Sequence, residues 1–449
     1  MKYLGPLLLL IFSYAHAQDV NSWWYLKNTG EALTPFLNSN IGIDLGVEEV
    51  YSSELFKATS ENKVLVAVLD SGLDFDHPDF QKSIALNEKD IFNNGVDDDD
   101  NGYVDDTYGW NFFDNNFAPN DLNGHGTHVA GIIHRITQGR AEILPVRYSG
   151  ADGSGNGWYL VQAINYAVLR GAKIINCSWD GALFEQNVYN AMKRAGERGV
   201  MFIVAAGNNG TNNDLLPNYP GNFGLENVFV IANMDQSGGL DSYSNYGKLS
   251  VDIAAPGDYI MSSKLGGGEV MMDGTSMAAA VATGSMALVK TLYPSLDSYE
   301  IKKLMMEFAE PYYKLQTRVK AGGFIKLSNI LKRSKAELPI IPDESWIRVE
   351  KKIESSHPYG IGSQIFFIDA PAQAKKMRII FERVDTDPND QICIKQRLQG
   401  TVDCISGKKE NYTSTIIEGN KVYIDFDRTY RAGNEHFGFN IKAIEYLEY

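Results

Sequence analysis

From residue 64 to about residue 333 the chain alternates short apolar runs with stretches of helical periodicity, and this alternation constrains the fold most. Five apolar runs, rich in β-branched residues and bounded by turn residues, lie at 64–69, 142–146, 173–178, 200–206 and 228–233. Helical patterns separate several of them, at 159–170 and 185–198. Fully apolar strands separated by helices are typical of a parallel sheet covered on both faces. We therefore expect a three-layer α/β domain that binds its ligands beyond the carboxyl ends of the strands.

The length of the chain and a change of pattern near residue 334 predict two domains. The chain has 449 residues, whereas single hydrophobic cores stop growing near about 250–300 residues. Segment 334–345 contains two prolines and is predicted to be a linker. Short alternating runs without helical periodicity follow, which predicts a small all-β sandwich over 346–449. Residues 63–333 then form the α/β domain, and residues 18–62 precede it as an N-terminal extension.

The first 17 residues have the three parts of a secretory signal peptide. Lys2 supplies a positive charge, residues 4–14 are almost wholly apolar, and Ala15 to Ala17 form an A-x-A cleavage site. The apolar run is too short to span a bilayer. No later stretch approaches 18 unbroken apolar residues, so we expect a secreted protein without a membrane anchor.

The charge of the chain argues against two classes of partner. The formal net charge is −15, while nucleic acids and anionic membrane surfaces require a basic footprint on the protein. An acidic chain suits a soluble protein that holds metal cations, and simple solubility explains the charge equally well. We therefore expect neither nucleic acid nor a membrane surface as partner.

The three cysteines fall into two groups. Cys177 lies in an apolar run and is predicted to be a buried free thiol. If residues 397–400 close a hairpin, residue 396 faces 401, and counting back places Cys393 opposite Cys404. Directly opposed strand residues are within reach of a disulfide, but the sequence leaves open whether the bond forms.

Four short motifs place reactive side chains beside glycines or at strand ends. They are Asp70-Ser71-Gly72 after the first strand, His125 between glycines ahead of a helix, Asn208 after the fourth strand, and Ser276 at the start of an alanine-rich helix. Acyl transfer needs these residue types together. A serine hydroxyl needs a base, an imidazole needs a carboxylate on its other nitrogen, and the oxyanion needs preorganised donors.

These motifs resemble those of the subtilisin-like serine proteases, or subtilases. The resemblance rests on DSG at 70–72, HGTHVAG at 125–131, AAGN at 205–208 and GTSMA at 274–278, in the order Asp, His, Ser, and covers about residues 23–333. It implies a three-layer subtilisin-like domain that acts as a serine endopeptidase on proteins or peptides. Asp70 would orient His125, the general base and acid. Ser276 would be the nucleophile and Asn208 an oxyanion donor.

The remaining histidines are expected to be structural. His128 lies one helical turn after His125, and His77 precedes a proline. His134 has no partner that the sequence reveals. The His125-x-x-His128 spacing could hold a metal, but no cysteine or acidic residue follows at a suitable spacing.

The resemblance also implies two extended segments that bind a peptide by strand addition. They are Gly153, Ser154 and Gly155, and Ser178, Trp179, Asp180 and Gly181. Asp180 stands where the family usually has glycine. It either favours a basic residue before the scissile bond or is a solvated loop residue. Asp79 matches a ligand of a family calcium site whose usual insertion is missing here, so that metal is not expected.

Residues 97–106 predict a Ca²⁺ loop. Taking Asp97 as position 1 places Asp99 at 3, Asn101 at 5, the Tyr103 carbonyl at 7 and Asp105 at 9. Oxygen ligands at alternating positions around a glycine turn are the front of an EF-hand-like loop. The usual glutamate at position 12 is missing, so another segment must complete the shell. The alternative is a solvated acidic loop.

Two other functions remain open. A catalytically silent binding protein could use the same fold, and a calcium-dependent adhesion protein could act through the β domain. That domain loosely resembles the sandwich appended to proprotein-convertase-type subtilases.

Overall fold

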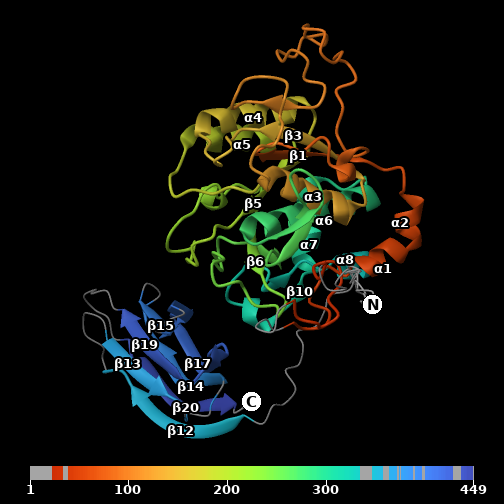
Figure 1. Ribbon diagram of the computed structural model, residues 1–449. Helices are drawn as coiled ribbons and strands as arrows, with labels where there is room; N and C mark the ends of the chain where they lie inside the picture. Colours follow the sequence, from red (N-terminus) through yellow and green to blue (C-terminus); the bar gives the residue numbers. More distant parts are fainter. Residues whose placement is uncertain are drawn as a thin grey trace, which may run out of the picture.

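The computed structural model describes residues 23–33, 39–333, 346–356, 364–371, 374, 376–387, 390–396, 400–427 and 436–447. An α/β group of elements occupies the ranges up to residue 333, and an all-β group follows residue 346 (Figure 1). The predicted signal peptide 1–17 and linker 334–345 lie outside the described residues.

A nine-stranded sheet in the order β10-β11-β7-β6-β5-β4-β1-β3-β2 forms the centre of the α/β group. Its neighbouring strands pair parallel, except for β10 with β11. The strands are β1 (Val64–Asp70), β2 (Trp110–Asn111), β3 (Ala141–Arg147), β4 (Ile174–Cys177), β5 (Met201–Ala205), β6 (Val228–Met234), β7 (Ile253–Pro256), β10 (Glu310–Pro311) and β11 (Gly323–Phe324). The five predicted strands are β1, β3, β4, β5 and β6, so the parallel sheet is confirmed.

Helices cover both faces of this sheet. The helices concerned are α3 (His125–Thr137), α4 (Gly157–Leu169), α5 (Gln186–Gly196) and α6 (Thr275–Leu292). Helices α3 and α6 pack against each other on one face, and α4 and α5 pack together on the other (Figure 1). The helices exclude water from both faces of the sheet, which explains why every residue of β5 and β6 is buried.

The order of the strands fixes where a ligand can bind. From β1 the chain moves to β3 on one side, and then returns across the sheet to β4 on the other side of β1. Such a reversal leaves a crevice at the carboxyl ends of the strands, because the connections on the two sides diverge there. Residues just after β1, β3 and β4 are therefore placed together.

The remaining elements of the α/β group are short. They are α1 (Val47–Ser52), α2 (Glu54–Ala58), α7 (Ser298–Glu307), α8 (Leu327–Lys332), the hairpin β8 (Ile260–Ser263) and β9 (Glu269–Met272), and the 3₁₀ helices Pro78–Phe80, Gly221–Phe223 and Tyr313–Leu315. The predicted N-terminal extension packs on the same core, because Trp24 and Tyr25 are fully buried in it. The Trp24 indole N–H donates to the Asp258 carbonyl at 2.9 Å.

The C-terminal group consists of two antiparallel sheets, ordered β12-β20-β14-β17, with β18 beside β14, and β13-β19-β15-β16. The strands are β12 (Ile347–Glu354), β13 (Gln364–Asp369), β14 (Lys376–Asp385), β15 (Gln391–Gln396), β16 (Gly400–Ile405), β17 (Lys408–Thr413), β18 (Ile417–Glu418), β19 (Lys421–Asp427) and β20 (Gly438–Leu447). Phe381 and Phe439 from one sheet and Phe426 from the other share a single buried core. This arrangement confirms the all-β domain.

Cys393 and Cys404 are joined by a disulfide across β15 and β16, with their Cα atoms 4.1 Å apart. The predicted pairing of residue 396 with 401 is wrong by one position, since Gln396 pairs with Gly400. A bulge after Ile394 takes up the extra residue and restores the cysteine pair. Cys177 is a buried free thiol, as predicted.

Among the helices that the structure describes, none is long and apolar enough to cross a membrane.

Candidate active site

Asp70 is the last residue of β1, at the point where the strand order reverses. Its side chain is 6% exposed, and its Oδ1 lies 2.7 Å from Nδ1 of His125. The Ser71 backbone N–H donates to the same oxygen at 2.8 Å. The buried carboxylate is thus held by one backbone donor while it faces the imidazole.

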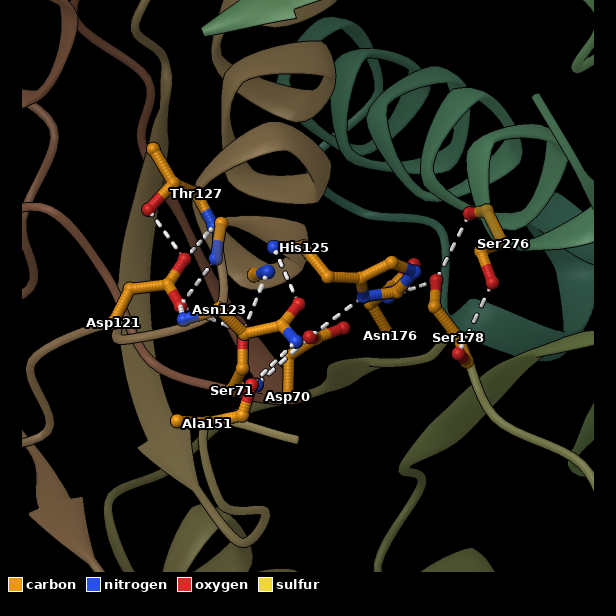
Figure 2. A network of polar contacts seen from close by, with 12 residues as sticks. Asp70, Ser71, Asp121, Asn123, His125, Thr127, Ala151, Asn176, Ser178 and Ser276 are labelled. Atoms are coloured by element: carbon orange, nitrogen blue, oxygen red, sulfur yellow. Dashed lines mark hydrogen bonds and ion pairs between the residues drawn. The ribbon is translucent and has the colours of Figure 1, made fainter. Parts of the chain in front are cut away.

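His125 is the first residue of α3, and the loop before it is held by Asp121. The two carboxylate oxygens of Asp121 accept hydrogen bonds from the backbone N–H groups of Asn123, Gly124 and Thr127 and from the Thr127 hydroxyl. This places a carboxylate at the start of a helix, where N–H groups lack partners within the helix. Figure 2 shows the His125 ring projecting from α3 between Asp70 and Ser276.

The pKa of His125 is raised above its ordinary value. Burial disfavours the charged imidazolium, but the charge of Asp70, its hydrogen bond and the charge of Asp121 outweigh burial. The imidazole is 31% exposed, so solvent can exchange protons with it. The pair is suited to accept a proton and to stabilise the resulting imidazolium.

Ser276 is the second residue of α6, and its half-buried side chain remains accessible. Its hydroxyl donates to the Ser178 carbonyl at 3.2 Å (Figure 2). No hydrogen bond joins this hydroxyl to His125 in the structure as described. Hydrogen bonds between a hydroxyl and its base are often long in the absence of substrate and tighten when substrate binds.

Asn208 follows β5 and points its amide nitrogen away from Thr275. The Thr275 backbone N–H and hydroxyl both donate to Asn208 Oδ1 at 2.9 Å. The Thr275 hydroxyl also accepts from the Gly207 N–H at 3.2 Å. Because Oδ1 is anchored, Nδ2 is the free end of the amide, and none of the described residues accepts from it. A free amide donor beside a nucleophile is the arrangement that stabilises an oxyanion.

A chain of buried hydrogen bonds runs behind Ser276. Thr283 donates to Asn176 Oδ1 at 2.8 Å, Asn176 Nδ2 donates to the Ser178 hydroxyl at 2.9 Å, and that hydroxyl donates to the Ser276 carbonyl at 2.9 Å. The chain fixes the end of β4 against the first turn of α6. Sequence reasoning missed Asn176, Thr283, Asp121 and Thr275. The sequence offered a signal only for Thr275, which directly precedes Ser276 in the GTSMA motif.

The two predicted substrate segments follow the carboxyl ends of β3 and β4, the two strands that flank β1. Gly153, Ser154 and Gly155 lie in the exposed loop between β3 and α4, and Ser178 to Gly181 follow β4. Tyr148 lies between them. Its ring is 6.3 Å from that of Trp179, and a Cβ on Gly155 would approach it to 2.7 Å. The structure brings Ser178 directly to Ser276, whereas the 153–155 segment lies further along the same edge.

The predicted calcium ligands are not gathered around one point. Asp97 accepts from the backbone N–H groups of Asn101 and Gly102, and Asn101 Oδ1 accepts from Tyr103 N–H. Asp105 instead accepts from Asn94 and Gly95, and Asp99 Oδ2 accepts from Asn87. In the described ranges no three acidic, histidine or cysteine side chains converge as metal ligands. Asp99 Oδ1, however, is buried and has no hydrogen-bond partner.

The other histidines make structural contacts. His128 is fully buried, its Nε2 lies 3.1 Å from the carbonyl oxygens of Ile260 and Val270, and burial lowers its pKa to about 4. His77 Nε2 lies 2.9 Å from the Gly268 carbonyl oxygen. His134, for which the sequence reveals no partner, has its Nδ1 2.8 Å from the Ser83 hydroxyl.

Asp79, which the sequence expects to lack calcium, is surrounded by protein groups. Its Oδ2 accepts from the Ser263 hydroxyl at 2.7 Å and lies 3.8 Å from both the Arg135 guanidinium and the His77 ring. Arg135 supplies a positive charge beside this carboxylate without a metal.

Comparison with known proteins agrees with this geometry. The profile of the subtilase family, peptidase S8, matches residues 61–340. Subtilisin-like protease 1 of Plasmodium vivax is 30% identical over 70% of this chain and 54% of its own length. The thermophilic serine proteinase of Bacillus sp. (strain AK1) is 31% identical over 66% of this chain and 69% of its own. Thermitase of Thermoactinomyces vulgaris is 30% identical over 54% of this chain and 81% of its own.

Solved structures show the same fold. A cold-adapted subtilisin-like serine proteinase superposes with a TM-score of 0.52 at 23% identity, over 68% of this chain and 98% of its own. A lanthipeptide protease superposes with a TM-score of 0.53 at 22% identity, over 64% of this chain and 94% of its own. The chain spans about half the length of the Plasmodium vivax relative.

Proposed function

The chain belongs to the subtilase family of serine peptidases, and on that premise we propose that it is an exported serine endopeptidase whose catalytic triad is Asp70, His125 and Ser276. The observation that carries the proposal is the 2.7 Å contact between His125 Nδ1 and Asp70 Oδ1, with Ser276 on the other side of the ring (Figure 2). Asn208 supports it, since its anchored amide leaves a donor beside the nucleophile.

In the first half of the reaction, His125 Nε2 takes the proton of the Ser276 hydroxyl as Oγ bonds to the carbonyl carbon of the substrate. The carbonyl π electrons move to oxygen, and Asn208 Nδ2 and the Ser276 backbone N–H donate to this oxyanion. When the intermediate collapses, the carbon–nitrogen bond breaks, and the imidazolium gives its proton to the leaving amine. The product is an ester between Ser276 and the acyl part of the substrate.

In the second half, a water molecule takes the place of the amine. His125 removes its proton, the water oxygen attacks the ester carbon, and the ester bond to Ser276 breaks while the proton returns to Oγ. Asp70 Oδ1 accepts the hydrogen bond from Nδ1–H, so Nε2 is the nitrogen that exchanges protons.

We further propose protein or peptide substrates that bind in extended form along Gly153–Gly155 and Ser178–Gly181. Both segments follow strand ends, and Ser178 is hydrogen-bonded to Ser276. Backbone groups would give most of the binding by strand addition, and side chains such as Trp179 would give selectivity. The N-terminal pattern of residues 1–17 supports export.

The alternative of a catalytically silent binding protein on the same fold predicts no acyl-enzyme. A fluorophosphonate probe reacts only with an activated serine. We expect it to label the folded wild-type protein at Ser276, and Ser276→Ala to abolish both labelling and casein hydrolysis. Folded wild-type protein that neither reacts with the probe nor cleaves casein would favour the binding function, or the adhesion function of the β domain.

We also propose that residues 97–105 bind structural Ca²⁺. The donor set of carboxylate, amide and carbonyl oxygens suits this cation, and the buried Asp99 Oδ1 lacks a partner. The fit is partial, because Asp105 turns toward Asn94 and Gly95. A bound Ca²⁺ would neutralise the carboxylates of this loop and take no part in peptide hydrolysis.

Thermal unfolding tests this site. A ligand at about 100 times its Kd stabilises the native state by about 2.7 kcal/mol. We expect EDTA to lower the unfolding temperature of the wild type and Asp99→Asn to weaken this dependence. Asp100→Asn, in the same loop but outside the alternating ligand positions, is the control and should keep it. A wild-type melting curve unchanged by EDTA would rule out the site.

A further inference from the structure

Asp180 lies on the segment that touches the nucleophile. The carbonyl oxygen of Ser178, two residues earlier, accepts a hydrogen bond from the Ser276 hydroxyl. Successive side chains of an extended segment point to opposite sides. Trp179 points toward Tyr148, with ring centroids 6.3 Å apart, and Asp180 points the other way, toward Asn218 and Gly207.

The carboxylate of Asp180 is held beside the oxyanion donor. Its Oδ2 accepts from Asn218 Nδ2 at 2.8 Å, and Asn218 is anchored in turn because the same nitrogen donates to the Ala206 carbonyl at 2.9 Å. A Cβ on Gly207 would come within 3.0 Å of Oδ2. Gly207 directly precedes Asn208, so the carboxylate lies between the segment that carries Ser178 and the segment that carries the oxyanion donor.

The negative charge of Asp180 has no counter-ion. Within the described part of the chain, no lysine, arginine or histidine nitrogen lies within 4.0 Å of its carboxylate. Asn218 is a neutral donor that positions the group without neutralising it. The side chain is exposed, so Oδ1 can receive a charged donor from outside the protein.

The Asp180 carboxylate lies close to Gly207, the residue before Asn208. A peptide whose scissile carbonyl lay between Ser276 Oγ and Asn208 Nδ2 would therefore bring the side chain before the scissile bond near segments 178–181 and 205–208. We propose that Asp180 selects a basic residue, arginine or lysine, immediately before the scissile bond. This inference rests on the proposed peptidase function and names its substrate class.

The contact with Asn218 distinguishes this role from that of a solvated loop aspartate. A solvated side chain would have no fixed partner and would sample several rotamers, whereas Asp180 has a bond to an anchored amide. An ordered, uncompensated carboxylate recognises guanidinium or ammonium groups through charge-assisted hydrogen bonds.

The test uses the full chain and peptides that are identical except at the residue before the scissile bond. Arginine and citrulline have nearly the same shape but differ in charge. We expect the wild type to prefer arginine over citrulline by about tenfold or more in kcat/KM, and the ratio to fall toward one in Asp180→Asn. Asp180→Lys should instead prefer glutamate over glutamine. Added salt should lower the wild-type ratio, because the site is exposed.

Asp76→Asn is the matched control, since Asp76 is an exposed carboxylate in the loop after β1, outside both proposed substrate segments. We expect it to keep the wild-type ratio. An equal fall of the ratio in Asp76→Asn and Asp180→Asn would overturn the assignment in favour of a general charge effect. If the wild type is labelled by the probe and cleaves the peptides, but with an arginine-to-citrulline ratio of kcat/KM near one, the preference for a basic residue alone would be overturned. Neither labelling nor cleavage of any peptide would overturn the peptidase function, and the specificity with it.

Discussion

Gly126 and Gly72 approach so closely that a Cβ on residue 126 would lie 2.3 Å from the Gly72 carbonyl oxygen and 3.2 Å from the Asp70 Cβ. The first turn of α3 therefore rests directly on the turn that follows β1. The Gly126 N–H also donates to the Ser71 hydroxyl at 2.9 Å. This backbone approach, rather than the His125–Asp70 contact alone, sets the distance between the imidazole and its carboxylate.

Gly126→Ala should therefore impair catalysis as well as stability. The added methyl must push α3 from the Asp70 turn, which costs about 1–3 kcal/mol as overpacking. A displacement of about 1 Å at a reacting group can cost about 10²-fold in rate. Activity assays well below the unfolding temperature, together with urea unfolding, separate the two effects.

Gly131→Ala is the control for this variant. Gly131 lies in the same helix, and its Cβ would meet the hydroxyls of Ser262 and Ser263 at 2.4 and 2.3 Å. We expect a similar loss of stability but a nearly unchanged kcat/KM. Equal losses of kcat/KM in both variants would contradict the role given to the Gly126 contact.

The raised pKa of His125 predicts the acid limb of the pH profile. His125 must be neutral to act as a base, so activity should fall as pH drops through a pKa above the ordinary value of 6.5. The Asp70→Asn variant loses the negative charge and the charge-assisted hydrogen bond that raise the pKa of His125, whereas the burial that lowers this pKa remains. The acid limb of its pH profile should therefore move to lower pH. kcat should also fall by about 10⁴-fold, because the imidazole tautomer is no longer fixed. Measurement of kcat/KM against pH for both proteins tests this.

The raised pKa of His125 also makes the free energy of unfolding depend on pH. A group whose pKa is raised on folding stabilises the native state below its unfolded pKa, and this contribution is lost as pH rises through the folded pKa. Wild type should therefore gain stability relative to Asp70→Asn as the pH is lowered from 8 to 6. A stability difference that is constant over this range would contradict the raised pKa.

The sequence predicts the triad because each member lies at a strand end or a helix start, where local pattern and position in the sheet are linked. Asp70 ends an apolar strand, and Ser276 begins an alanine-rich helix. The support behind these residues could not be predicted, because its partners are distant in the chain. Ser71 meets Asp121 across 50 positions, and Asn176 meets Thr283 across 107. Only folding brings such polar side chains together.

The register of the C-terminal hairpin shows a different limit. Counting back from the turn gave the right cysteine pair but the wrong pairing at residue 396, because a bulge after Ile394 shifts the strands by one residue. Bulges depend on how the side chains of both sheets fit the core, and alternation along one strand does not reveal them. The predicted calcium loop is a similar case, because the directions of its carboxylates depend on contacts such as that of Asn87 with Asp99.

Thr275 should act as a positioning residue for Asn208. Its hydroxyl donates to Asn208 Oδ1 and accepts from the Gly207 N–H. Thr275→Val keeps the shape but leaves the amide held by a single donor, so we expect kcat to fall by about tenfold with little change in KM. Thr275→Ser should restore most of the rate.

Thr291→Val is the control for the fold of α6, because the Thr291 hydroxyl donates only to the Leu288 carbonyl of the same helix. It should leave kcat unchanged. If Thr275→Ser is as slow as Thr275→Val, then packing of the methyl group, and not the hydroxyl, governs the site.

The Cys393–Cys404 disulfide should stabilise the β domain without affecting catalysis. The cysteines are 11 positions apart, and closing so short a loop reduces the entropy of the unfolded chain by an amount worth about 2–3 kcal/mol. Replacing both cysteines with serine should lower the unfolding temperature of the β domain and leave kcat/KM unchanged, because the triad lies in a separate core. Cys177→Ala, which removes a thiol from the α/β core, is the contrasting variant and should destabilise that domain instead. A loss of kcat/KM in the double serine variant, with the α/β domain still folded, would mean that the β domain contributes to the active site.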